Sequence, residues 1–337
     1  MNHSILTCSP YFVELAVNEI CRSHPSIIVL DTLSPGCLLI QAPVSFDQLT
    51  RPFREHLPIY LHHLFPIQKT VSLDISSVKQ AIEKLMSQHP TATIQARILP
   101  DMVNGADAVA MPPFNEVVQF FQRWEGPSPA VTGKILSVAI ARQHTKWRVF
   151  MGVSWANQNI SPYAGGVRPY KVQMPNRAGY KLLEALTDFG IRLREGDHAL
   201  DLGAAPGAWT MVLRQRGLKV TAVAPTEMYP NLLDDPMVMY RGMTAENYLP
   251  QAEGPFDVIT NDMRMDAQDS SRLMVQYAKL LRPDGLAIVT LKLRQPNMRR
   301  LMDHSFRILR QAYKIMQVRQ LVSNRQEVCL FLRPKIE

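Results

Sequence analysis

The C-terminal half of the chain predicts an α/β fold with a mostly parallel, doubly wound sheet. From residue 177 onward, short apolar segments alternate with amphipathic segments of helix length, as in parallel strands joined by crossover helices. A tight glycine-rich turn, Asp201-Leu-Gly-Ala-Ala-Pro-Gly-Ala-Trp-Thr210, follows the first predicted strand and opens a helix. The chain has 337 residues, 46% of them hydrophobic, which is enough for a second domain with its own core.

The predicted elements of this half follow one another closely. Helices are expected at residues 178–189, 209–216, 270–281 and 297–313, and strands at 197–202, 219–224, 256–260 and 286–293. Arg282-Pro-Asp-Gly285 has the proline-then-glycine order of a turn. The segments 317–322 and 327–332 are expected to close the sheet as an antiparallel pair.

Residues 1–156 are predicted to form a separate α+β domain. A helix is expected at 11–20, strands at 26–31, 37–41 and 91–98, and a hairpin from 135–141 and 147–153. Residues 157–176 mix proline and glycine with polar residues and are expected to form a linker or ordered loop. This leaves residues 177–337 as the second domain. The first domain has neither a glycine-rich phosphate loop nor a nucleophile with a partner, so its residues assign no chemistry.

Composition narrows the class of protein. No apolar segment reaches the ~20 residues of a membrane-spanning helix, and the N-terminus lacks a signal-peptide pattern, so we expect a cytoplasmic protein without a membrane partner. The four cysteines are scattered, which predicts neither a disulfide framework nor a zinc cluster. His62 and His63 have no third ligand at metal spacing and are expected to be a surface pair, so no metal is expected.

The glycine turn at residues 201–210 predicts a ligand crevice. Gly203 and Gly207 let the backbone approach a ligand closely, because they carry no Cβ. The glycine spacing is not that of a dinucleotide fingerprint, and no Lys-Ser or Lys-Thr pair follows, so neither a dinucleotide site nor a P-loop is predicted. Ligands of α/β folds bind at the carboxyl ends of the strands, where this turn is expected to lie.

This turn is similar to the S-adenosylmethionine motif of Rossmann-like methyltransferases, and its Ala-Pro-Gly core most resembles FtsJ-like ribose 2′-O-methyltransferases that act on RNA. The resemblance implies a Rossmann-like, seven-stranded methyltransferase sheet that ends in an antiparallel pair. It also implies S-adenosylmethionine as the cofactor. The cofactor-binding residues that it implies, together with the nearest acid after the second strand, are Asp201, Gly203, Ala204, Ala205, Pro206, Gly207, Ala208, Trp209, Glu227 and Asp262.

Methyl transfer to a ribose 2′-hydroxyl needs a base, because the hydroxyl is a poor nucleophile until it loses its proton. A lysine can serve if burial and neighbouring cations lower its pKa from about 10.4 toward neutrality. A nearby carboxylate can hold that lysine and balance charge as the proton moves. Four charged residues are expected to meet at one crevice, namely Lys181, Asp262, Lys292 and Glu327.

The contexts of these four residues resemble the Lys-Asp-Lys-Glu tetrad of the FtsJ-like enzymes. Arg177-Ala-Gly-Tyr-Lys181-Leu, Asn261-Asp262-Met263 and Thr290-Leu-Lys292-Leu are similar to the first-lysine, aspartate and second-lysine motifs. The segment from Val318 to Val328, which contains Glu327, is close to the terminal motif of enzymes that methylate a cytidine ribose in 23S ribosomal RNA. The resemblance covers roughly residues 160–337. It implies that Lys292 is the general base with Asp262 beside it, while Lys181 and Glu327 orient the ribose and tune the lysine.

Two departures from the family pattern bear on the cofactor. The second strand ends at Ala224, where methyltransferases usually place an acid that binds the cofactor ribose, and the nearest acid is Glu227. Where the family often has an aspartate near the adenine, this chain has Met243-Thr-Ala-Glu-Asn247. Either Glu227 and Glu246 substitute for these acids, or affinity for the cofactor is low.

Other methyl-transfer chemistries are disfavoured. The Asn/Asp-Pro-Pro-Tyr/Phe signature of amino-group methyltransferases is absent, which argues against methylation of a base nitrogen. No cysteine lies in the site segments, which argues against the thiolate mechanism of pyrimidine C5 methylation.

A basic stretch predicts an RNA partner. Residues 292–319 contain eight lysines and arginines and one acid, Asp303. Several of the basic residues recur at helical spacing, which is typical either of a solvated helix face or of a phosphate-binding face, and the near absence of acids favours the second. The residues expected to bind RNA are Arg294, Arg300, Arg307 and Arg310.

Three hypotheses about function follow. The first is a ribose 2′-O-methyltransferase of ribosomal RNA, most closely resembling the large-subunit (23S) enzymes. The second is a catalytically weakened relative that binds RNA, and the third is a methyltransferase of another hydroxyl, such as that of a tRNA. By order and length, the first domain resembles the part of a ribosomal RNA ribose methyltransferase family that carries a THUMP-like RNA-binding module. An oligomerisation role or a structural role remains open for it.

Overall fold

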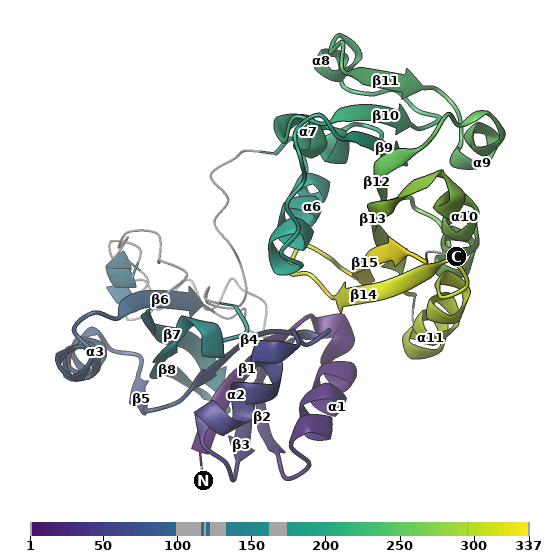
Figure 1. Ribbon diagram of the computed structural model, residues 1–337. Helices are drawn as coiled ribbons and strands as arrows, with labels where there is room; N and C mark the ends of the chain where they lie inside the picture. Colours follow the sequence, from purple (N-terminus) through teal and green to yellow (C-terminus); the bar gives the residue numbers. More distant parts are fainter. Residues whose placement is uncertain are drawn as a thin grey trace. The chain divides into compact units, whose positions relative to one another are not determined.

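The computed structural model describes residues 2–98, 116–117, 119–121, 133–161, 174–294 and 296–335. The chain divides into two compact units, Met1–Pro169 and Tyr170–Glu337 (Figure 1). Residues 162–173, the larger part of the predicted linker, lie outside the described residues.

The N-terminal unit contains two four-stranded sheets with helices, as expected for an α+β domain. The elements of the first sheet and its helices are β1 (Asn2–Cys8), α1 (Val13–Ser23), β2 (Ile28–Ser34), β3 (Cys37–Ala42), α2 (Phe46–Glu55) and β4 (Leu61–Pro66). The strand order is β2-β3-β1-β4, and all pairs are antiparallel. A capping box between Ser45 and Gln48 starts α2.

The second sheet packs between a helix and the first sheet. Its elements are β5 (Lys69–Ser72), α3 (Ile75–Gln88), β6 (Thr93–Ile98), β7 (Lys134–Gln143) and β8 (Lys146–Trp155). The order is β5-β8-β7-β6, with β7 and β8 forming the expected hairpin. Ile82 and Leu85 of α3 join one core with this sheet. Ile5, Phe65 and Phe150 belong to a second core, which joins the two sheets.

The sequence prediction missed several elements of this unit and misplaced one histidine pair. It assigned no strand to β1, β4 or β5 and no helix to α2 or α3. His62 and His63 were expected on the surface, which is wrong, because both are buried in β4. The ring of His63 also contacts the backbone oxygen of Ser161 through Nδ1 at 2.9 Å.

The C-terminal unit is built around one seven-stranded sheet. Its strands are β9 (His198–Leu202), β10 (Lys219–Val223), β11 (Val238–Arg241), β12 (Phe256–Asn261), β13 (Leu281–Lys292), β14 (Tyr313–Arg319) and β15 (Glu327–Pro334). Its helices are α6 (Arg177–Asp188), α7 (Ala208–Gln215), α8 (Pro230–Leu233), α9 (Ala245–Tyr248), α10 (Ala267–Tyr277) and α11 (Met298–Leu309).

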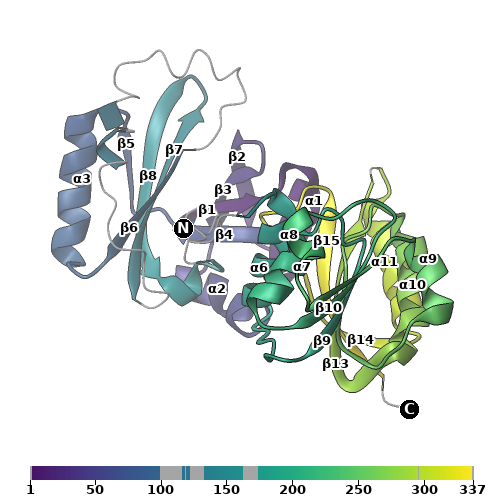
Figure 2. The same ribbon diagram turned by 90° about the horizontal axis from the view of Figure 1, so that it is seen from above.

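This sheet has the order β11-β10-β9-β12-β13-β15-β14. The first five strands are parallel, and β15 is antiparallel to both β13 and β14. Helices α6 and α7 cover one face, and α10 and α11 cover the other (Figure 1 and Figure 2). The Rossmann-like fold with an antiparallel closing pair is therefore confirmed. The strand order reverses between β9 and β12, and such a switch point is where α/β sheets bind ligands.

Several predicted boundaries in this unit are wrong, and among them the strand expected at 317–322 is β14 at Tyr313–Arg319. The helix expected to reach residue 313 ends at Leu309, because Tyr313 begins β14, is fully buried and donates to the backbone oxygen of Met274 at 2.9 Å. Helix α10 begins before residue 270, because the Asp266 side chain caps it by accepting from Gln268 N at 2.8 Å. The turn expected at 282–285 is an irregularity inside β13, whose pairing with β12 shifts there.

No helix in the part of the chain that the structure describes has the length and apolar character to cross a membrane.

Candidate active site

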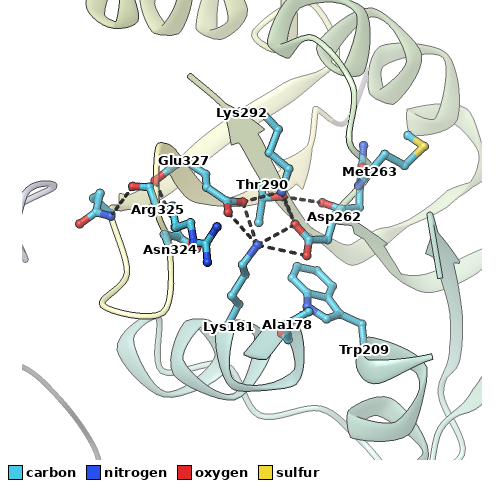
Figure 3. A network of polar contacts seen from close by, with 12 residues as sticks. Ala178, Lys181, Trp209, Asp262, Met263, Thr290, Lys292, Asn324, Arg325 and Glu327 are labelled. Atoms are coloured by element: carbon cyan, nitrogen blue, oxygen red, sulfur yellow. Dashed lines mark hydrogen bonds and ion pairs between the residues drawn. The ribbon is translucent and has the colours of Figure 1, made fainter. Parts of the chain in front are cut away.

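The four predicted tetrad residues come together at the carboxyl edge of the sheet. Lys181 lies on α6, Asp262 directly follows β12, Lys292 ends β13 and Glu327 begins β15. Lys292 and Glu327 are paired in the register of β13 and β15. Figure 3 shows the four side chains pointing toward one another.

Direct contacts join all four side chains. Lys181 Nζ donates to Glu327 Oε1 and Oε2 at 2.9 and 2.8 Å, and to both Asp262 oxygens at 3.3 Å. Lys292 Nζ donates to Asp262 Oδ1 and to Glu327 Oε2. Thr290 extends this network, because it accepts from Lys292 Nζ at 2.9 Å and donates to Asp262 Oδ1 at 2.5 Å. The result is a neutral cluster of two ammonium groups and two carboxylates.

The pKa shifts within this cluster differ from those expected from the sequence. Burial alone would raise the pKa of Asp262, but the Lys292 and Lys181 ammonium groups outweigh burial and lower it. Burial alone would lower the pKa of Lys292, but the Asp262 and Glu327 carboxylates outweigh burial and raise it. From the sequence, a lysine with a lowered pKa was expected. Without substrate or cofactor the pKa of Lys292 is instead raised, because two carboxylates contact it.

The glycine turn lies against the tetrad. Gly203 has a φ of +75°, and a Cβ there would lie 2.5 Å from Cγ of Met263, the residue after Asp262. Gly207 has a φ of +121°, and a Cβ there would lie 2.2 Å from Cδ1 of Leu232. Only glycine fits both positions. The turn therefore packs closely against Met263, the residue after Asp262.

Two residues expected to bind the cofactor have side chains directed into the protein. Asp201 is 1% exposed, and its two oxygens accept from Thr210 Oγ1 at 2.7 Å and from Thr260 Oγ1 at 2.9 Å. Trp209 is 3% exposed, and its Nε1 donates to the backbone oxygen of Ala178 at 2.8 Å. In these positions the two side chains support the turn and α6 from inside. Burial raises the pKa of Asp201 to about 6.

The other turn residues differ in exposure. Ala204 and Ala208 are buried, Ala205 is half-buried and Pro206 is exposed. The amides of Gly203 and Ala204 both donate to the backbone oxygen of Val223, at 2.9 and 3.2 Å. These bonds fasten the turn to the end of β10.

The two acids suggested for the adenosine end are both accessible. Glu227 is exposed in the loop that follows β10, and Glu246 is exposed on α9. Tyr240 holds the start of that loop, because its hydroxyl contacts the backbone oxygens of Ala224 and Thr226 at 3.2 and 3.1 Å. Glu227 is thus accessible in the loop at the carboxyl end of β10.

The four arginines predicted to bind RNA are all exposed, but they do not share one helix. Arg300 and Arg307 lie on α11, Arg310 is its C-cap, and Arg294 precedes it. A hollow of about 440 Å³ on α11 is lined by Pro296, Asn297, Arg299, Arg300, Asp303 and Arg307. A larger hollow of about 620 Å³ lies at the amino edge of the sheet, beside Asp197 and Asp257, and is lined by no predicted site residue.

Sequence reasoning assigned no role to three residues that contact the tetrad segments. Thr290 lies in the second-lysine motif, and its contact with Asp262 depends on the pairing of β12 with β13. Glu184 lies one helical turn after Lys181, a spacing that places both on one side of α6. Asn324 is buried and donates through Nδ2 to the backbone oxygen of Glu327 at 3.2 Å.

In the described ranges, no three His, Cys, Asp or Glu side chains gather as a metal site would need.

Comparison with known proteins finds a family model and several named relatives that match part of this chain. Residues 174–314 match the family model described as FtsJ-like methyltransferase. "Ribosomal RNA large subunit methyltransferase M" of Halorhodospira halophila is 41% identical over 108 residues, which are 31% of each chain. The protein of the same name from Pseudomonas putida (strain W619) is 33% identical over 204 residues, which are 55% of each chain. The chain thus matches about a third to a half of the length of these relatives.

Among solved structures, TrmN from Thermus thermophilus aligns over 99% of this chain and 100% of its own, at 15% identity and a TM-score of 0.42.

Proposed function

We propose, from the FtsJ-like methyltransferase domain that residues 174–314 carry, that this protein is a ribose 2′-O-methyltransferase of large-subunit ribosomal RNA. The names of the relatives support the substrate class. The observation that carries the proposal is the contact of Lys181, Asp262, Lys292 and Glu327 beside the glycine turn. With ribosomal RNA as substrate, the cytoplasm is the proposed compartment.

Lys292 is the proposed general base for the 2′-hydroxyl proton. Its side chain is 19% exposed, against 7% for Lys181, so Lys292 is the lysine that a substrate can reach. An ammonium group cannot accept a proton, so Lys292 must first release one. The two carboxylates favour its charged form, and a further positive charge beside the cluster would favour release of that proton.

The remaining tetrad residues hold this base and the ribose. Asp262 and Glu327 both contact Lys292, so they fix its position and balance charge as a proton moves. Lys181 bridges the same two carboxylates from the other side. When Lys292 loses charge, Lys181 keeps both carboxylates paired. We propose that Lys181 and Glu327 also orient the ribose.

The glycine turn is the proposed site of S-adenosylmethionine, which supplies an activated methyl group on a sulfonium. The residues present fit such a ligand, since Gly207 is the N-cap of α7 and this helix has no acid in its first turn. Free amides at a helix N-terminus bind carboxylates, such as that of a methionine group. The backbone of residues 203–208 would hold this end, with Asp201 and Trp209 supporting it from inside.

Glu227 is the proposed anchor for the cofactor ribose. The strand that usually carries this acid ends here in Ala224, and Glu227 lies exposed on the following loop. The Tyr240 contacts hold the loop in place. Because a loop carboxylate three residues further on is less constrained than a strand-end acid, we expect weaker cofactor binding than with the usual arrangement.

The arginines around α11 are the proposed RNA contacts. Arg299, Arg300 and Arg307 line one hollow with a single acid, and arginine binds phosphate groups bidentately. Arg294 follows Lys292 by two residues and is exposed, so it is also proposed to contact the RNA. For the N-terminal domain, residues 1–156, a THUMP-like RNA-binding role is proposed.

Methyl transfer from labelled S-adenosylmethionine tests the proposal. Large-subunit ribosomal RNA, small-subunit ribosomal RNA and tRNA, all from cells lacking the gene, would be offered as substrates. We expect label in the large-subunit RNA only. Label in tRNA instead would show that the substrate is tRNA and not large-subunit ribosomal RNA. Label in none of the three RNAs would contradict the enzyme hypothesis.

Ala224 stands where methyltransferases usually place the acid that binds the cofactor ribose. This favours one second candidate, a relative that binds RNA without turnover. Calorimetry with S-adenosylmethionine distinguishes it from the enzyme. Binding is expected for the enzyme, and its absence would support the RNA-binding candidate. Glu227→Gln should weaken this binding, whereas Glu253→Gln, on another loop, should leave it unchanged.

A further inference from the structure

Helix α6 is held in place on both sides of Lys181. Three residues before it, the backbone oxygen of Ala178 accepts from Trp209 Nε1 at 2.8 Å (Figure 3). Three residues after it, Glu184 is 5% exposed and its two oxygens accept from the amides of Val322 and Ser323, at 2.7 and 2.9 Å. Lys181 thus lies between two contacts with separate segments of the chain.

The segment that Glu184 holds leads directly into Glu327. At its other end, the amide of Leu293, which follows Lys292, donates to the backbone oxygen of Gln326 at 2.7 Å. The segment is therefore fastened to α6 by Glu184 and to the end of β13 by Leu293. It connects the helix that carries Lys181 to the strands that carry Lys292 and Glu327.

The tetrad residues differ in what fixes them. Strand pairing fixes Lys292 opposite Glu327, and β12 lies beside β13 in the same sheet. Lys181 alone comes from a helix, so its distance from the two carboxylates depends on how α6 is docked. A carboxylate suits this docking, because it accepts from two amides at once, whereas a glutamine side chain has one acceptor oxygen and an NH₂ group.

We propose that Glu184 is a positioning residue, which docks α6 so that Lys181 bridges Asp262 and Glu327 and shares them with Lys292. The inference rests on the proposed function, because its kinetic readout is methyl transfer. Lys181 competes with Lys292 for both carboxylates and repels it as a like charge. If Lys181 is displaced, Asp262 and Glu327 interact with Lys292 alone. Lys292 then holds its proton more firmly.

Glu184→Gln tests this role. Displacing a catalytic group by about 1 Å costs on the order of 100-fold in rate, so we expect kcat to fall by between about 10- and 100-fold. KM for both substrates should stay within about twofold, since Glu184 touches neither. The acid limb of the kcat–pH profile should move to higher pH. Trp209→Phe, which removes the other contact and keeps a ring, should move the limb in the same direction.

Asp235→Asn is the control. Asp235 also accepts from a backbone amide, Met237 N at 2.8 Å, and from Arg214 Nε at 2.8 Å, but it precedes β11 at the amino edge of the sheet. The Asp235→Asn variant should change the melting temperature without moving the acid limb of the kcat–pH profile. A wild-type kcat and pH limb in Glu184→Gln would overturn the inference. If that variant does not fold, Glu184→Asp, which keeps the charge and shortens the reach, is judged by the same criteria.

Amide hydrogen exchange keeps this test separate from the proposed function. The amides of Val322 and Ser323 should exchange at least about tenfold faster in Glu184→Gln than in wild type, because their acceptor is weakened. Unchanged exchange would contradict the docking contact, whatever the activity. If the wild-type protein transfers no methyl group, the proposed function fails, while the exchange measurement still decides whether Glu184 holds the segment.

Discussion

Lys292 and Glu327 lie directly opposite each other in the antiparallel pairing of β13 and β15. Side chains paired across neighbouring strands project from the same face of a sheet, so the strand register itself brings this ammonium and this carboxylate into contact. Asp262, which directly follows the neighbouring strand β12, contacts the same ammonium. The charged centre of the site is thus part of the sheet rather than of a surface loop.

Removing the proposed base should stop methyl transfer. Lys292→Ala is expected to lower kcat by about 10²- to 10⁴-fold, which is the usual contribution of a general base. Binding of S-adenosylmethionine, measured by calorimetry, should stay nearly unchanged because the glycine turn is intact. Lys279→Ala, an exposed lysine on the same domain, is the control. Retained turnover in Lys292→Ala would place the base elsewhere.

The activity of the wild-type protein should rise with pH. The Asp262 and Glu327 carboxylates raise the pKa of Lys292, so its neutral form, the one that can accept a proton, becomes more abundant as pH increases. Glu327→Gln removes one of these carboxylates and should move the acid limb of the kcat–pH profile to lower pH. A limb that stays in place would show that Lys292 does not control it.

Asp201 should make the fold less stable as pH rises through its titration range. Burial raises its pKa from 3.8 to about 6, so the folded protein holds this proton more firmly than the unfolded chain does. Its contribution is greatest below 3.8 and is lost as the pH approaches and passes about 6. The shift corresponds to roughly 3 kcal/mol.

Asp201→Asn should therefore flatten the dependence of melting temperature on pH between about 4 and 7. The asparagine can still contact Thr210 and Thr260, whose hydroxyls can donate or accept. An unaltered pH dependence in this variant would mean that Asp201 is ionised in the folded protein throughout that range.

Gly203 should tolerate no side chain. Gly203→Ala combines a positive φ with a collision against Met263, so it should cost more than the roughly 1–3 kcal/mol of a strained backbone alone. Gly196→Ala is the matched control, because Gly196 has a φ of +86° but nothing within 4 Å of a built Cβ. Melting temperatures and cofactor binding would be compared. Equal effects in the two variants would contradict close packing of the turn on the aspartate segment.

The arginines on α11 should contribute to RNA binding through phosphate groups. Arg300→Ala and Arg307→Ala should each weaken binding and reduce the slope of log K against log salt by about 0.7 to 0.9. Arg216→Ala, an exposed arginine at the end of α7, serves as the control. Salt slopes identical to wild type in both Arg300→Ala and Arg307→Ala would place the RNA on another surface.

Six strands of the seven-stranded sheet and the glycine turn could be predicted, because each depends on local pattern, whereas β11 was missed. Alternating strands and helices predict a mostly parallel sheet, and the short motifs around Asp262, Lys292 and Glu327 lie at the ends of strands. The direction of the Asp201 side chain could not be predicted, because its threonine partners come from α7 and β12. Only the assembled sheet shows that it faces inward.

Two other features also depend on tertiary contacts. The pKa of Lys292 is set by two carboxylates from separate strands, so sequence reasoning from burial and cations gave the wrong direction. The helix predicted through residue 313 has a continuous amphipathic pattern, but Tyr313 is buried at the start of β14 instead. In both cases, contacts between distant segments outweigh local sequence preference.

Mapping ribose methylation tests the central claim most directly. A 2′-O-methyl group blocks alkaline cleavage of the RNA chain at that nucleotide. After incubation of unmodified large-subunit ribosomal RNA with the protein and S-adenosylmethionine, we expect one new alkali-resistant position, which is absent with Lys292→Ala. Methylated RNA that gains no alkali-resistant position, or RNA that gains no methyl group, would contradict the account.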